Sequence, residues 1–112
     1  MIPSWYHRGG KNMILQIMIL NTMKYEKDGT NRSRLAYIIP NTESFSDTDK
    51  FHGYSELSAY RNDTAFFDKI PVEFIGQKCN IKIEEKPSKL NPMKSYKEIV
   101  EVSCNGKTIP LV

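Results

Sequence analysis

Two dipeptides that favour tight hairpin turns constrain the fold of this chain more than any other feature: Asp28-Gly29 and Asn105-Gly106. Each lies between apolar, β-branched segments, and this arrangement is typical of a β-hairpin. The first belongs to a turn over residues 27–31, which joins the apolar run Met13–Met23 to the segment Arg34–Ile39. We therefore predict an antiparallel strand pair here, with the start of its first strand buried on both faces.

The second dipeptide predicts a hairpin near the C-terminus. It joins a strand over residues 96–103 to a short terminal strand over residues 108–112. Val100 and Val102 are expected on one face of the longer strand, and Ile99 on the other. Pro110 has no N–H to donate to a sheet, so the terminal strand is expected at an edge.

Between these hairpins the sequence predicts two more strands and one short helix. Residues 54–61 alternate in polarity, and residues 79–84 alternate most regularly of all, as half-buried strands do. Residues 62–64, Asn-Asp-Thr, offer capping groups for a helix over 65–69, which Pro71 ends.

Two expectations complete the layout. The polar and acidic segment 41–53 is predicted to be a long loop. Three apolar side chains at and after the short helix are expected to fill the bottom of the core: Phe66, Phe67 and Ile70.

Size and composition favour one soluble globular domain. The chain has 112 residues, of which 39% are hydrophobic and 26% charged. Its longest apolar run is too short to span a bilayer, so we expect a cytoplasmic protein that does not bind membranes. Cys79 and Cys104 do not make a disulfide framework and are expected to be buried free thiols.

Residues 1–12 differ from the rest and hold the only Trp. Codons for Arg8-Gly9-Gly10 can contain AGGAGG, a bacterial ribosome-binding sequence, a few bases before the codon of Met13. We interpret residues 1–12 as a translated leader or a disordered tail, and residues 13–112 as the single domain. The net charge of the whole chain is +3 and that of residues 13–112 is +1, so any electrostatic function depends on local clustering.

Basic residues do cluster, in two connections between strands that are bordered by tyrosines. The first is Lys24–Arg34, and the second is Lys86–Lys97, which holds four lysines and no acidic residue. Cations beside flat rings suit a polyanion with stackable bases.

The predicted order of elements is that of the OB-fold, a five-stranded, partly open Greek-key barrel with the helix between strands three and four. The chain resembles the small OB-fold single-stranded DNA-binding proteins of bacteriophages and mobile elements over about residues 13–103. The fold class expected is therefore mainly all-β: a five-stranded OB-like Greek-key barrel with one short helix and a C-terminal hairpin. The resemblance implies a non-enzymatic role in phage or plasmid replication, with sequence-tolerant binding through the two basic loops.

The candidate site residues are cations for the phosphates and tyrosines for the bases. The cations are Lys24, Lys27, Arg32, Arg34, Lys86, Lys89, Lys94 and Lys97. The tyrosines are Tyr25, Tyr37, Tyr60 and Tyr96. Arg32 and Arg34 lie two apart on a strand and should therefore face the same side. The sequence does not separate DNA from RNA as the partner, and a homo-oligomer is compatible with it.

Other functions stay open. The chain could be a small β-barrel adaptor that binds protein in a phage or conjugation assembly, through the edge near Pro110 and the acidic segment 41–53, or an accessory subunit of an enzyme. We predict no catalytic, metal or cofactor site. His52, near Asp47 and Asp49, has no partner at metal-ligand spacing and is expected to be simply exposed.

Overall fold

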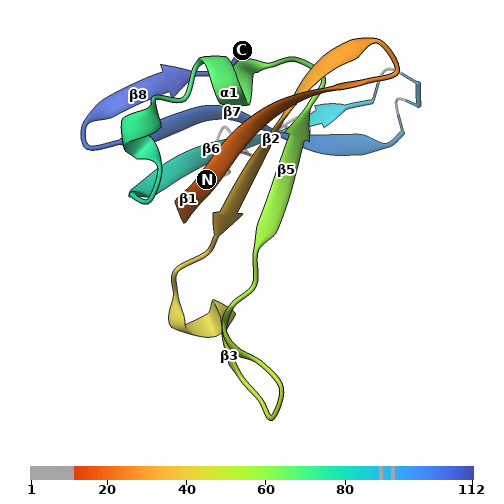
Figure 1. Ribbon diagram of the computed structural model, residues 1–112. Helices are drawn as coiled ribbons and strands as arrows, with labels where there is room; N and C mark the ends of the chain where they lie inside the picture. The colour runs from red at the N-terminus through yellow and green to blue at the C-terminus, as the bar shows by residue number, and fades with distance from the viewer. Residues whose placement is uncertain (1–11, 89, 92) are drawn as a thin grey trace, which may run out of the picture.

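The computed structural model describes residues 12–88, 90–91 and 93–112. It is a mainly β protein, as predicted, with a six-stranded antiparallel sheet in the order β5-β2-β1-β6-β7-β8 and a two-stranded sheet β3-β4 (Figure 1). Within the described residues, one short α-helix and two 3₁₀ turns, Thr42–Ser44 and Val72–Phe74, connect the strands. The elements are β1 (Asn12–Lys27), β2 (Thr30–Ile38), β3 (Phe45–Asp47), β4 (His52–Tyr54), β5 (Leu57–Arg61), α1 (Ala65–Asp68), β6 (Lys78–Pro87), β7 (Ser95–Cys104) and β8 (Lys107–Pro110).

Strand β1 is shared by the two halves of the large sheet. Its residues 12–18 pair with β6 and its residues 18–27 pair with β2, with a bulge between Ile19 and Asn21. β6, β7 and β8 therefore run across β1, β2 and β5 in Figure 1, and the curved sheet encloses the core.

Both predicted hairpin turns are confirmed. Asp28 and Gly29 have φ angles of 53° and 75°, and Asn105 and Gly106 have 51° and 82°. Two consecutive positive φ angles match the right-handed twist of the flanking strands. β2 begins at residue 30, directly after the turn and four residues earlier than predicted.

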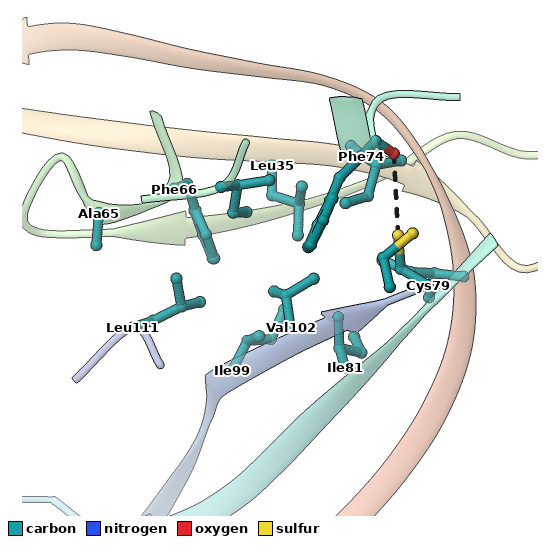
Figure 2. Close-up of a cluster of buried hydrophobic side chains, with 13 residues drawn as sticks. Leu35, Ala65, Phe66, Phe74, Cys79, Ile81, Ile99, Val102 and Leu111 are labelled. Atoms are coloured by element: carbon teal, nitrogen blue, oxygen red, sulfur yellow. Dashed lines mark hydrogen bonds between the residues drawn. The ribbon is translucent and has the colours of Figure 1, made fainter. Parts of the chain in front are cut away.

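The core lies between the two halves of the sheet (Figure 2). Strand residues such as Leu35, Ile81 and Val102 pack there, with Phe66 from α1 and Phe74 from the second 3₁₀ turn. The burial predicted for Phe66 and Ile70 is confirmed, whereas Phe67 is 42% exposed and the prediction for it was wrong. α1 buries Ala65 and Phe66. Successive side chains of a helix point about 100° apart, so Phe67 is turned away from the core.

The prediction that β1 starts buried on both faces was also wrong. Met13 and Ile14 are exposed, whereas Ile17 and Ile19 are fully buried. The sheet curves around a single core, so only one face of β1 is covered. The regular alternation of residues 79–84 is confirmed, with Cys79 and Ile81 buried.

β7 corrects a further expectation. Ile99, Val100 and Val102 are all buried, and Ile99 shares the core cluster with Val102 instead of facing away from it. The register with β6 shifts between Lys82 and Ile83, so a β-bulge displaces the alternation by one residue. β8 lies at the edge of the sheet, as Pro110 predicted, although the strand ends there and Leu111 is buried in the core.

The predicted long loop 41–53 is instead ordered. It contains a 3₁₀ turn and the hairpin of β3 and β4, in which Tyr54 pairs with Phe45, so the third strand of the large sheet begins only at Leu57. Thr48 accounts for the turn because its Oγ1 accepts hydrogen bonds from the N–H groups of Lys50 and Phe51, at 3.3 and 3.0 Å. Polarity alone does not reveal which side chain of a polar segment forms such a turn.

No closed barrel is present among the described residues, because β5 and β7 share no hydrogen-bonded ladder. A side chain joins them instead: Nη1 of Arg61 at the end of β5 donates a hydrogen bond of 3.1 Å to the carbonyl of Ile99 in β7. The large sheet therefore has two edges, β5 and β8.

Candidate nucleic-acid interface

The outward face of β1, β2 and β5 carries alternating rings and cations. In the strand register, Tyr25 lies opposite Arg32, and Arg34 lies between Met23 on β1 and Tyr60 on β5. The two arginines thus share one face, as their spacing predicted. Ser33 and Leu35 alternate with them and face the core, so folding itself directs the arginines outward.

These side chains line a surface cleft of about 500 Å³, within the size range of ligand pockets. We call it the tyrosine–arginine cleft. Its lining residues are Met23, Tyr25, Lys27, Arg32, Arg34, Tyr60 and Asn62. No acidic side chain is among these described residues, so the cleft has a formal charge of +3.

Arg32 and Arg34 have no carboxylate partner among the described residues. The Nε atoms of both arginines are buried and make no hydrogen bond, and Arg34 Nη2 makes only a long contact of 3.5 Å to Asn21 Oδ1. The two guanidinium groups therefore have no internal charge partner among the described residues, and an anion that accepts hydrogen bonds from their outer N–H groups would bind favourably here.

A second cleft of about 620 Å³ lies between β5 and the first residues of β7. Tyr37, Tyr96 and Lys97 line it, while Tyr60 and Asn62 line both clefts, so the two clefts adjoin. Tyr60 and Tyr96 are 64% and 47% exposed. Tyr37 is half-buried and packs against the core, and burial raises the pKa of its hydroxyl.

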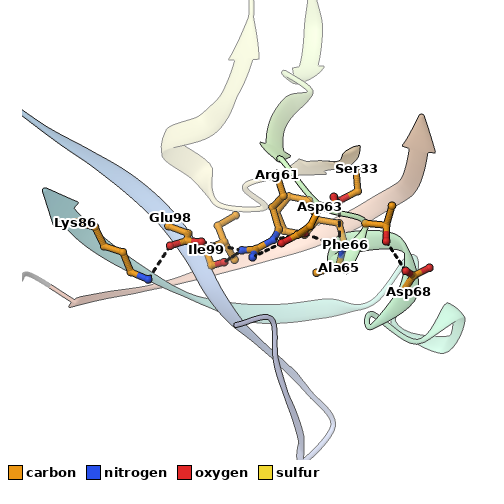
Figure 3. Close-up of polar contacts among 10 residues, drawn as sticks. Ser33, Arg61, Asp63, Ala65, Phe66, Asp68, Lys86, Glu98 and Ile99 are labelled. Carbon is orange, nitrogen blue, oxygen red and sulfur yellow. Dashed lines mark hydrogen bonds and ion pairs between the residues drawn. The ribbon is translucent and has the colours of Figure 1, made fainter. Parts of the chain in front are cut away.

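A polar network forms the floor of this second cleft (Figure 3). Arg61 Nε and Nη2 each lie 2.9 Å from a carboxylate oxygen of Asp63, and Nη1 lies 3.2 Å from Glu98 Oε2. Glu98 in turn holds Lys86 Nζ at 2.8 Å. The hydrogen bond from Arg61 lowers the pKa of Asp63, and the one to Glu98 raises the pKa of Lys86.

Eight of the twelve predicted residues therefore line the two adjoining clefts. Lys86 is bound to Glu98. Lys24 lies on the other face of β1, with its Nζ 4.9 Å from the ring centre of Phe67. Lys94 is exposed in the β6–β7 connection, away from both clefts, and Lys89 lies outside the described residues. The remaining eight are Tyr25, Lys27, Arg32, Arg34, Tyr37, Tyr60, Tyr96 and Lys97.

Sequence reasoning missed Met23 and Asn62 as lining residues. Met23, Tyr25 and Lys27 stand at every second position, which indicates one face of a strand, but the predicted strand ended at Met23. Asn62 was predicted only as a helix-capping residue. The capping acceptor is in fact Asp63, whose Oδ1 accepts from the N–H of Ala65 at 3.0 Å.

Other chemistry-bearing residues do not form a site. His52 Nδ1 and Asp47 Oδ1 are 2.9 Å apart on exposed side chains, and no cluster of metal-ligating side chains occurs within the described ranges. Cys79 and Cys104 are buried free thiols, as predicted. In the part of the chain that the structure describes, no helix is long and apolar enough to cross a membrane.

Comparisons with protein-family models, with curated proteins and with solved structures gave no match to this chain.

Proposed function

We propose that this chain is a non-enzymatic, OB-like protein that binds single-stranded nucleic acid, DNA in particular, across the two adjoining clefts. The observation that carries the proposal is the pair of unpartnered arginines, Arg32 and Arg34, held between Tyr25 and Tyr60 on one exposed face. Guanidinium groups form bidentate hydrogen bonds with phosphates, and tyrosine rings stack on any base.

The strand order supports the OB-like part of the proposal. The order β5-β2-β1-β6-β7, with α1 between β5 and β6, has the third strand beside the second and the first strand between the second and fourth. In a partly open barrel of this kind the second and third strands bind the oligonucleotide. Here those strands are β2 and β5, which carry Arg32, Arg34 and Tyr60.

The chemistry favours sequence-tolerant binding of a single strand. Phosphate contacts and stacking on rings discriminate little between bases, and these are the contacts that the cations and tyrosines of the cleft offer. A single strand also exposes its base faces to the tyrosines, which a duplex does not.

A fluorescence titration with oligo-dT at several salt concentrations tests the function. The double variant Arg32→Ala/Arg34→Ala should bind at least roughly tenfold more weakly, and its salt slope should fall by about 1.4, because each phosphate contact on a single strand contributes about 0.7. Tyr60→Ala should lose about 1–3 kcal/mol of binding free energy, the value of one stacked base.

Lys107→Ala is the matched control. It removes a cation from β8, at the opposite edge of the sheet from β5, and should leave both affinity and salt slope unchanged. Circular dichroism verifies that each variant is folded. If the unmodified protein does not bind oligo-dT at low salt, the proposal is wrong, and a protein-binding adaptor becomes the better hypothesis.

A further inference from the structure

A second surface has the chemistry of a ligand for the cleft. The segment 41–56, which we call the arm, contains β3 and β4 and projects from the body of the molecule at the bottom of Figure 1. A compact chain of about 100 residues has a radius of gyration near 13 Å. The value here is 15.7 Å, as expected for a body with a projecting arm.

The arm presents aromatic side chains to solvent. Phe45, Phe51 and Tyr54 are 48%, 44% and 39% exposed. The rings of Phe45 and Tyr54 pack edge to face with their centres 5.4 Å apart, and Thr48 fixes the turn between the strands. These rings are therefore held in place, so little conformational entropy would be lost when they bind a partner.

The arm is also acidic. It carries four exposed carboxylates against one lysine, a net charge of −3 with His52 neutral. Negative charge beside flat rings is the combination that the tyrosine–arginine cleft is suited to bind. The cleft has a formal charge of +3 and no acidic lining residue of its own. The four carboxylates are Glu43, Asp47, Asp49 and Glu56.

The arm cannot reach the cleft of its own molecule. Arg32 lies near the start of β2, whereas the arm follows the end of the same strand. The six residue steps from Arg32 to Ile38 span roughly 20 Å, and Figure 1 has the arm leading away from the β1–β2 turn. A second copy of the chain offers the same complementary cleft.

We propose that the arm of one molecule docks in the tyrosine–arginine cleft of a second copy, which joins copies head to tail. Acidic arm and nucleic acid then compete for one surface. The inference uses the same cleft as the proposed function, but it concerns self-association in the absence of nucleic acid.

Sedimentation velocity of the full chain, without nucleic acid, tests the proposal. Association should grow with protein concentration at low salt and should weaken as salt screens the opposite charges. Added oligo-dT should displace the arm and release monomers. A protein that is monomeric at low salt and high concentration overturns the proposal.

Two variants locate the contact. The arm variant is Asp49→Lys/Phe51→Ser, and the cleft variant is Arg32→Ala/Arg34→Ala. The association of each should be weakened by at least roughly tenfold, because each loses a central charge or an aromatic anchor. Mixed together they should form a 1:1 complex, since the intact arm of one meets the intact cleft of the other. Glu73→Lys, a charge reversal outside the arm, is the control and should associate normally.

The outcomes separate the two proposals. Association that survives in the arm variant, or a mixture that forms no complex, overturns arm docking. A monomer that binds oligo-dT overturns arm docking alone, and a self-associating protein that does not bind oligo-dT overturns the proposed function alone.

Discussion

The three arginines of the described chain differ in their partners. Arg61 makes a bidentate contact to Asp63 and further contacts to Glu98 and the Ile99 carbonyl, and its side chain is 8% exposed. Arg32 and Arg34 have no such partners. Arg61 is therefore part of the fold, whereas the other two are available to a ligand. Residue type alone did not separate these roles, because two of the acceptors of Arg61, Glu98 and the Ile99 carbonyl, come from a distant segment.

The two cysteines are predicted to be inert in the native protein. Burial, with the neighbouring Cys104 thiol, raises the pKa of Cys79 to about 12, so its reactive thiolate is scarce at neutral pH. Cys104 is 3% exposed. We expect negligible labelling by a thiol reagent such as DTNB in native buffer and labelling of both residues in denaturant. Rapid labelling of the folded protein would contradict the buried placement.

At the scale of elements, the β1–β2 hairpin positions most of the cleft. Gly29 has a φ of 75°, and a Cβ built there would meet no atom within 4 Å. Only backbone strain therefore opposes Gly29→Ala, which should lower the free energy of unfolding by about 1–2 kcal/mol. Gly29→Asn is the control and should cost less, because Asn tolerates this conformation. Urea denaturation measures the free energy of unfolding of both variants. A Gly29→Ala variant as stable as the unmodified protein would argue against this turn.

The elements that sequence predicted well are those with strong local signals. Asp28-Gly29 and the alternation of residues 79–84 each specify their conformation within a few residues. The bulge at Ile99, the β3–β4 hairpin and the exposure of Phe67 were not predictable in this way. They depend on register shifts, on a threonine-based turn and on which side of a single helical turn meets the core.

At the scale of the whole molecule, Arg61 bridges β5 and β7, which no backbone ladder joins. Arg61→Met should lower the free energy of unfolding by about 2–3 kcal/mol, less than the 3–5 kcal/mol of a fully buried pair, because Asp63 is 54% exposed. Lys107→Met removes an exposed ion pair with Glu73 and should change the free energy of unfolding by less than about 1 kcal/mol. Similar effects of the two substitutions would refute the bridging role.

Acid titration extends this prediction. The hydrogen bond from Arg61 lowers the pKa of Asp63 below the ordinary value of 3.8. Its stabilising contribution is therefore complete above the unfolded pKa and is lost as pH falls through the lower folded value. The unmodified protein should lose stability steeply below about pH 4, and Arg61→Met should lose less over the same range.

The candidate site was partly predictable because most of it lies on one hairpin. The sequence alone placed Tyr25, Arg32 and Arg34 within ten residues, and strand alternation put the two arginines on one face. Bringing Tyr60 beside them needed the pairing of β2 with β5, and bringing Tyr96 near needed the curvature of the entire sheet. No local pattern contains that information.

The division of β1 between two partners also affects how the protein is made. Residues 12–18 cannot pair until β6 has been synthesised, some 60 residues later in the chain, whereas residues 18–27 pair with β2, which follows directly. At about 5–20 residues per second, a nascent chain leaves this apolar segment unpaired for roughly 3–12 seconds on the ribosome. Residues 12–18 of β1 are thus the place where a chaperone would most usefully bind the emerging polypeptide.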